Sequence, residues 1–241
     1  MRTPNLEDVI ANGSEHPIPA VAVPDHHDRR RPLVLCLWDA PNMDASLFSV
    51  TGADHHTVVR PQYDAFGRWL AAQGVPGDGS SNSGGGPNGH DVEALLFLSV
   101  VSNRATQVAP FVTAARQSGF TVFCRDRDEG DIDDALVAVA AQRLAERDQP
   151  GTLIVCSADQ DLARVAAGPA KDAGWRVMVV AYRELCGWTA EADYEFLDPE
   201  DIPGLFPRRL DRFDLAHLPA GGVFAPSLRQ LVPSPTSAGR H

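Results

Sequence analysis

Acidic residues follow short apolar runs at well-separated places in this sequence of 241 residues. The first run, residues 33–38, ends at Asp39, and a later run, residues 152–157, is followed by Asp159. A third acidic group opens an apolar segment with a helical period. Carboxylates are preferred ligands of hard divalent cations, which serve the hydrolysis of phosphate esters. The candidate site residues are Asp39, Asn42, Asp131, Asp133, Asp134, Ser157, Asp159 and Asp161.

The segments that carry these residues alternate between two patterns. Apolar runs of strand length lie at residues 33–38, 94–101, 120–125, 152–157 and 175–182. Helical patterns lie at residues 63–74, 105–119, 131–147 and 159–174. Strands that are apolar throughout and alternate with helices are typical of a parallel sheet covered on both faces. The sequence therefore predicts a three-layer, Rossmann-like α/β sandwich with a mostly parallel sheet of five or six strands.

The acidic residues are expected to meet at one edge of this sheet. Ligands of open parallel sheets bind beyond the carboxyl ends of the strands, and in the usual doubly wound order the first and fourth strands are neighbours. Asp39 and Asp159 would then face each other, with the acids at 131–134 close by. Crowded carboxylates repel one another, and their pKa values rise unless a cation compensates them. The single lysine, Lys171, is not nearby, so the sequence favours bound Mg²⁺ or Mn²⁺.

Phosphoryl transfer is the chemistry that such a site predicts. A divalent ion held by carboxylates can activate a water molecule, stabilise the pentacoordinate phosphorus and neutralise the leaving oxygen. Asn42 and Ser157 are expected to orient water or a phosphate oxygen. Ser157, Asp131 and Asp134 are further expected to support the ligands or to position the substrate.

Several motifs carry a resemblance to a known family. The stretches LWDAPNMDASL, GDIDDALVAVA and VCSADQDLARVAA, followed by AGWRVMVVA and the closing segment CGWTAEADYEFLD, resemble the NYN domain in order and spacing. This family belongs to the PIN-like superfamily of metal-dependent ribonucleases, and the resemblance extends over residues 32–198. It implies a PIN-like form of the sandwich, an acidic pocket for Mg²⁺ or Mn²⁺, and endonucleolytic cleavage of RNA, here expected to be single-stranded.

The resemblance also implies roles for individual residues. Asp39 matches the aspartate of the first strand, with Asn42 as its companion amide. Asp133 matches the aspartate of the third helix, because an apolar residue precedes it as in the family. Asp159 and Asp161 match the pair after the fourth strand. The implied metal ligands are therefore Asp39, Asp133, Asp159 and Asp161, and the implied catalytic set adds Asn42.

The sequence departs from the family pattern at three points. The stretch RDEGDID contains no lysine, although the family often has one shortly before the aspartate of the third helix. Position 139 is valine where a further aspartate is common, and position 158 is alanine where glycine is common. These departures concern how the substrate is bound and how many metal ions are held, and they leave the acidic residues in place.

Composition limits the class of the protein. An apolar content of 44% is enough to bury a core, and no apolar run approaches the ~20 residues of a membrane span. The N-terminal segment lacks the apolar region of a secretory signal, and the four cysteines form no CxxC pair, which favours free thiols in a reducing compartment. The net charge of -11 argues against coating nucleic acid through bulk charge. We expect a soluble, cytoplasmic protein.

The predicted organisation has one folded domain. Residues 1–31 are expected to form a flexible arm, residues 32–200 the nuclease domain, and residues 201–241 a partly ordered tail. A low-complexity loop at 74–91 is expected at the edge of the sheet opposite the acids.

Other interpretations stay open at this point. Each aspartate alone is also explained as a helix or turn cap. A non-catalytic RNA-binding or regulatory module on the same fold is the second hypothesis for function. A metal-dependent phosphohydrolase acting on small phosphoesters is the third, although the signature DxDx(T/V) is absent. Whether the chain forms a homo-oligomer is left open.

Overall fold

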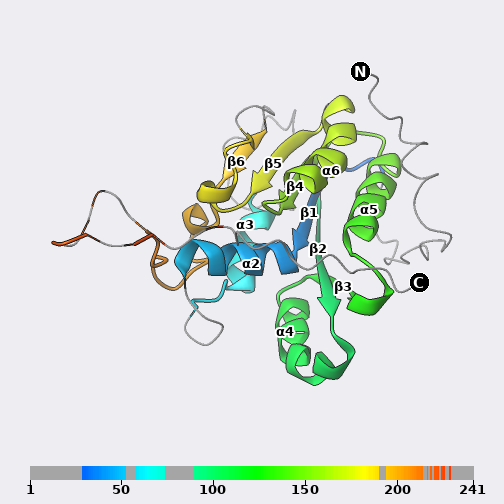
Figure 1. Cartoon of the computed structure of the whole chain (residues 1–241). Coiled ribbons are helices and arrows are strands. Elements are labelled where there is room, and N and C mark those ends of the chain that lie inside the picture. The colour runs from blue at the N-terminus through cyan, green and yellow to red at the C-terminus, as the bar shows by residue number, and fades with distance from the viewer. Residues whose placement is uncertain are drawn as a thin grey trace, which may run out of the picture.

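The computed structural model describes residues 29–52, 58–73, 90–189 and 194–213, with several positions between 216 and 228. Six strands form one sheet in the order β3-β2-β1-β4-β5-β6, and all neighbouring pairs are parallel (Figure 1). The strands are β1 (Leu33–Asp39), β2 (Asp91–Val100), β3 (Thr121–Asp126), β4 (Thr152–Cys156), β5 (Arg176–Val180) and β6 (Glu195–Leu197). The Rossmann-like α/β sandwich is thus confirmed, and β1 and β4 are neighbours as predicted.

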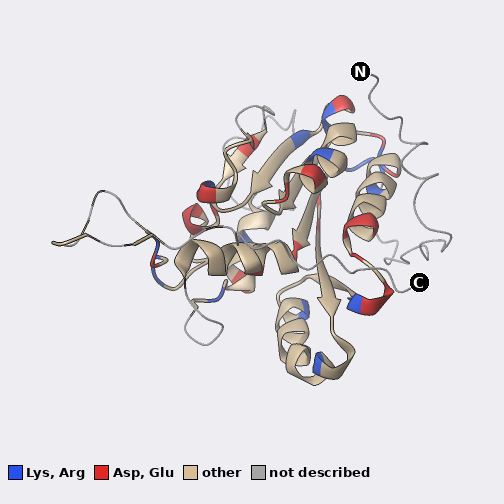
Figure 2. Ribbon diagram, in the orientation of Figure 1, with Lys and Arg blue, Asp and Glu red and all other residues tan. Residues whose placement is uncertain are grey.

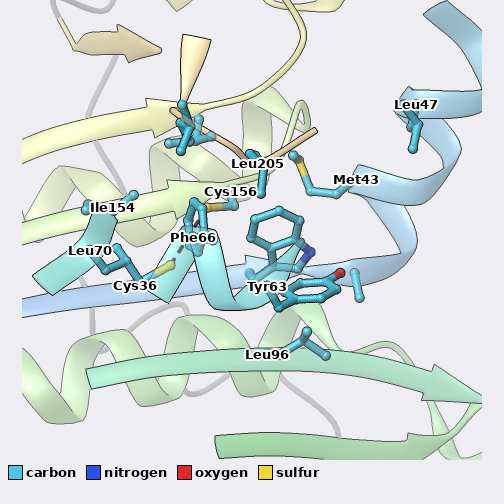
Figure 3. Close-up of a cluster of buried hydrophobic side chains, with 14 of the residues drawn as sticks. Cys36, Met43, Leu47, Tyr63, Phe66, Leu70, Leu96, Ile154, Cys156 and Leu205 are labelled. Carbon is cyan, nitrogen blue, oxygen red and sulfur yellow. Dashed lines mark hydrogen bonds between the residues drawn. The ribbon is translucent and has the colours of Figure 1, made fainter. Parts of the chain in front are cut away.

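Helices cover both faces of the sheet. The helices of the described residues are α2 (Ala40–Thr51), α3 (Tyr63–Ala71), α4 (Ala105–Gln117), α5 (Asp133–Ala145) and α6 (Gln160–Asp172). Side chains of α2, α3 and α4 pack into one hydrophobic cluster, which includes Phe66 and Leu70 (Figure 3). Side chains of α5 and α6, including Leu136, pack into a second cluster on the other face.

The central strand β1 contributes to both clusters in strict alternation. Val34, Cys36 and Trp38 face α2 and α3, whereas Leu33, Leu35 and Leu37 face α5 and α6. Burial on both faces explains why this strand is apolar throughout. The pleat has a period of two residues, so the next position on the α5 and α6 face is residue 39. The core packing therefore decides on which side of the sheet the first candidate aspartate lies.

The elements differ from the prediction in several places. The helical patterns found in the sequence do not include the stretch between the first strand and residue 63, whereas α2 begins directly at residue 40. Pro41 lies in the first turn, where proline is tolerated because its missing N–H would be unpaired there in any case. Strand β2 begins at Asp91, three residues before its predicted start, and α5 and α6 are shorter than their predicted segments.

The fold continues past residue 200. Ile202, Leu205 and Leu210 are buried against the sandwich. The predicted arm up to residue 28, residues 74–89 of the predicted loop 74–91 and most of the tail beyond 213 lie outside the described residues, and Asp91 belongs to β2 instead of the loop. All four cysteines are free, and within the described ranges no helix is long and apolar enough to cross a membrane.

Candidate active site at the carboxyl edge

Asp39 ends β1 and caps the helix that follows. Its backbone is extended, and its Oδ1 accepts a hydrogen bond from the N–H of Asn42 at 3.2 Å. The side chain is almost fully buried, with 4% of the residue exposed. The capping interpretation and the site interpretation of Asp39 therefore hold together, because one oxygen caps α2 while the other faces β4.

Ser157 joins the ends of β1 and β4. Its buried hydroxyl donates to Asp39 Oδ2 at 2.9 Å and accepts from the N–H of Asp159 at 3.1 Å. One hydroxyl thus sets the positions of both candidate aspartates at once. The predicted meeting of the first and fourth strand ends is realised in this hydrogen-bonded bridge.

Asn42 makes a second link across the same gap. Its Oδ1 accepts from the N–H of Ala158 at 2.8 Å and from the hydroxyl of Ser46 at 3.3 Å. The amide therefore holds the first turn of α2 against the turn between β4 and α6. Ser46 was not identified from the sequence, although it lies four residues after Asn42 and so on the same side of a helix.

Asp159 and Asp161 lie at the start of α6. Asp159 Oδ1 accepts from the N–H groups of Asp161 and Leu162, at 2.9 and 3.0 Å, and so caps the helix. Asp159 is half-buried, whereas Asp161 is exposed in the first turn. The two residues therefore lie at the same helix start but differ in their exposure to solvent.

The third acidic group surrounds the start of α5. Asp133 is the first residue of the helix and is half-buried, whereas Asp131 and Asp134 are exposed. Arg125, on β3, binds the carboxylate of Asp134 at 2.6 Å and also donates to the carbonyl oxygen of Asp131. An ion pair of Arg125 with one of the many acids is what the sequence favours, but the sequence does not identify Asp134 as the partner. Figure 2 shows the acidic residues at the β1–α2 junction and at the starts of α5 and α6.

Electrostatic coupling connects the three groups. Burial raises the pKa of Asp39, hydrogen bonds from Ser157 and Asn42 oppose the rise, and the charges of Asp159 and Asp131 add to it. Partial burial raises the pKa of Asp133 from 3.8 to about 6, with contributions from Asp131, Asp39, Asp159 and Asp134. The carboxylates after β1, after β4 and at the start of α5 therefore lie within range of one another.

The Asp133→Asn variant is expected to change how stability depends on pH. The pKa of Asp133 is higher in the folded chain than its ordinary value. Protonated Asp133 therefore contributes to the free energy of unfolding below pH about 4, and this contribution is lost as the pH rises through about 6. Asparagine does not ionise, so the variant should gain stability relative to the parent chain between pH 4 and 7. Thermal unfolding in EDTA across this range measures the difference. The control is Asp172→Asn, at the far end of α6, and a difference that does not change with pH contradicts the prediction.

The donor groups suit a divalent cation that keeps much of its water. No three carboxylate, thiolate or imidazole groups of the described residues form a ready set of metal ligands. Mg²⁺, however, is commonly held by one or two carboxylates together with several waters. Each oxygen of Asp39 accepts one of the hydrogen bonds described above and has a further lone pair. Burial and the charges of neighbouring acids raise the pKa values of Asp39 and Asp133, and a bound cation would relieve both effects.

Comparisons with known proteins add little to this geometry. No model of a known protein family matches the chain, and no curated protein sequence matches it. Among solved structures, one match is the crystal structure of VPA0982, a protein of unknown function from Vibrio parahaemolyticus RIMD 2210633. The identity is 17%, the TM-score is 0.47, and the match covers 75% of this chain and 98% of that chain. Function therefore has to be inferred from the residues at the carboxyl edge of the sheet.

Proposed function

We propose that this protein is a metal-dependent endoribonuclease. The observation that carries the proposal is the bridge in which Ser157 binds both the carboxylate of Asp39 and the backbone of Asp159, with Asp133 in electrostatic range. Acids that are distant in the sequence thus share one edge of the sheet, where ligands of this fold class bind. The similarity of the motifs around Asp39, Asp133 and Asp159 to the NYN domain supports RNA as the substrate.

The residues that would hold Mg²⁺ or Mn²⁺ are Asp39, Asp133 and Asp159. Asp161, the exposed second residue of α6, would serve as a further ligand or as the base that orients the attacking water. The cation, when bound, would neutralise charge that develops on the phosphate oxygens and lower the pKa of a water ligand. A bound cation would also offset the mutual repulsion of these carboxylates at neutral pH.

The chain's own contribution is to hold these groups before the substrate arrives. Ser157 and Asn42 fix Asp39 through two hydrogen bonds, and the helix caps fix the backbone on either side. Preorganised groups do not have to reorient during the reaction, which is a major source of catalytic advantage. Asp131 is expected to line the entrance because it is exposed beside the half-buried Asp133.

The Ser157→Ala variant is expected to lower kcat about tenfold, because supporting hydrogen bonds to metal ligands commonly contribute about 10–100-fold. The substitution removes the donor to Asp39 and the acceptor of the Asp159 N–H together. Steady-state cleavage of a labelled RNA measures the change, with Ser49→Ala as the control, which removes one hydroxyl that donates to the carbonyl oxygen of Ala45. Equal kcat values for Ser157→Ala and the parent chain would show that the bridge has no part in the reaction.

The proposal is tested by incubating the purified chain with an end-labelled single-stranded RNA. We expect internal cleavage with Mn²⁺ or Mg²⁺, none in EDTA, and recovery when the metal is restored. Single-stranded DNA of the same sequence and p-nitrophenyl phosphate are the comparison substrates. Cleavage of p-nitrophenyl phosphate alone would support a small-molecule phosphohydrolase, and cleavage of no substrate would contradict the enzymatic proposal.

A non-catalytic RNA-binding module is the second candidate function. Two observations favour it. Val139 is buried in the core, so α5 offers no further acid there, and Asp39 is only 4% exposed. In that case metal raises the melting temperature and RNA binds, but the RNA stays intact.

A further inference from the structure

Arg125 is held at a fixed place relative to Asp39 by the register of the sheet. Asp39 on β1 pairs with Phe97 on β2, and Phe97 pairs with Phe123 on β3. Arg125 lies two residues beyond Phe123 on the same face of its strand, which is about 6.6 Å further along. Its guanidinium carbon lies 5.5 Å from the centre of the Phe123 ring.

The guanidinium of Arg125 binds the chain on both sides of Asp133. The same nitrogen, Nη1, donates to the carbonyl oxygen of Asp131 and to the carboxylate of Asp134. Asp131 and Asp134 each also accept from the backbone N–H of the next residue, at 2.7 Å in both cases. Ile132, between them, is buried in the core beneath α5. The residues on either side of Asp133 are therefore tied down.

Resting on the proposed function, we propose that Arg125 is a positioning residue that makes Asp133, rather than Asp134, the cation ligand at the start of α5. By pairing with Asp134, it neutralises the neighbouring carboxylate and draws it towards β3. By binding the Asp131 carbonyl, it holds the turn that precedes Asp133. Arg125 itself touches neither the cation nor the reacting phosphate.

Losing the charge of Arg125 and losing its positioning contacts are expected to change cation affinity in opposite directions. Removing a positive charge near a cation site should tighten cation binding through electrostatics alone. Removing a tether that orients a ligand should weaken binding, commonly by about 10–100-fold for supporting groups. A loss of affinity in a variant without this charge is therefore not explained by the charge itself.

The test is calorimetric titration of Mn²⁺ into the full chain at neutral pH. Arg125→Gln is expected to bind Mn²⁺ about tenfold or more weakly than the parent chain. Arg125→Lys, which keeps the charge but not the forked geometry, should show an intermediate loss. The matched control is Arg127→Gln, which removes the same charge from an exposed arginine two residues on and should bind as tightly as the parent or slightly more tightly.

Each outcome decides the question. Unchanged or tighter binding by Arg125→Gln would overturn the positioning role while leaving the proposed nuclease intact. If Arg125→Gln fails to fold, unchanged binding by Arg125→Lys would overturn it instead. If the parent chain binds Mn²⁺ but cuts no RNA, the proposed function fails and the role of Arg125 in cation binding remains. A parent chain without saturable Mn²⁺ binding would overturn both.

Discussion

Replacing Asp39 with asparagine is expected to lower the rate of Mn²⁺-dependent RNA cleavage by about two to three orders of magnitude, the range found when one preorganised electrostatic contact is removed from an active site. Asparagine has nearly the same volume but carries no charge. The carboxylate of Asp39 is the most deeply buried of the proposed ligands, so no neighbouring group takes over its place at the end of β1. Gel analysis of single-turnover cleavage measures the rate.

The Asp39→Asn variant should stay folded, which separates a chemical defect from a structural one. It loses at most one of two hydrogen bonds, a change of about 1 kcal/mol, and it removes a buried charge whose pKa is already raised. Asp159→Asn should behave in the same way, because asparagine is as good a helix cap as aspartate. Asp172→Asn, at the end of α6 away from this edge, is the control that should keep full activity. Cleavage by Asp39→Asn within a few-fold of the parent rate would contradict the assignment.

Replacing Asp198 with alanine is expected to lower the free energy of unfolding by about 3–5 kcal/mol, as is usual when one partner of a buried ion pair is removed. Asp198 is 1% exposed and binds Arg212 through both carboxylate oxygens, at 2.9 and 2.7 Å. It also accepts from the backbone and side chain of Arg183, at 3.0 Å each. Without it, Arg212 is left buried with fewer partners, and the segment after residue 200 loses one of its attachments to the sandwich. Urea denaturation measures the loss.

The same variant carries a pH signature. Burial raises the pKa of Asp198, but hydrogen bonds from Arg212, Glu200 and Arg183 outweigh it and hold the pKa below its ordinary value. The stabilising contribution is therefore present above pH about 4 and is lost as the pH falls through the folded-state pKa. The difference in the free energy of unfolding between Asp198→Ala and the parent chain should therefore become smaller at acidic pH. Asp211→Ala, an exposed neighbour, is the control, and a loss of less than about 1 kcal/mol at pH 7 would show that the ionic contacts are weaker than expected for a buried pair.

The parts of the fold that follow from periodicity were predictable from the sequence. Each run of β1, β4 and β5 is apolar on both faces, which marks a covered parallel strand without reference to any partner. The order of neighbours then follows from the few topologies that such alternation permits. This is why Asp39 and Asp159 could be placed beside each other from the sequence alone.

The parts that depend on side-chain partners were not predictable in the same way. In helix α2, apolar and polar residues are only weakly separated onto opposite faces, so the sequence pattern does not indicate a helix. The start of α2 is fixed instead by the cap that Asp39 provides. The pairing of Arg125 with Asp134 joins β3 to α5, and nothing in the spacing of the two residues indicates it. The equivalence of Asp131, Asp133 and Asp134 in the sequence is broken only by the contacts of the folded chain.

The most direct test of a cation site at this edge is the binding of Mn²⁺ to the purified chain, followed by calorimetry in the parent, Asp39→Asn, Asp159→Asn and Asp172→Asn proteins. One saturable class of sites is predicted in the parent and in Asp172→Asn, and a large loss of affinity in both Asp39→Asn and Asp159→Asn. Binding that is absent from the parent chain, or equally strong in all four proteins, would contradict the central claim that these distant carboxylates share one cation.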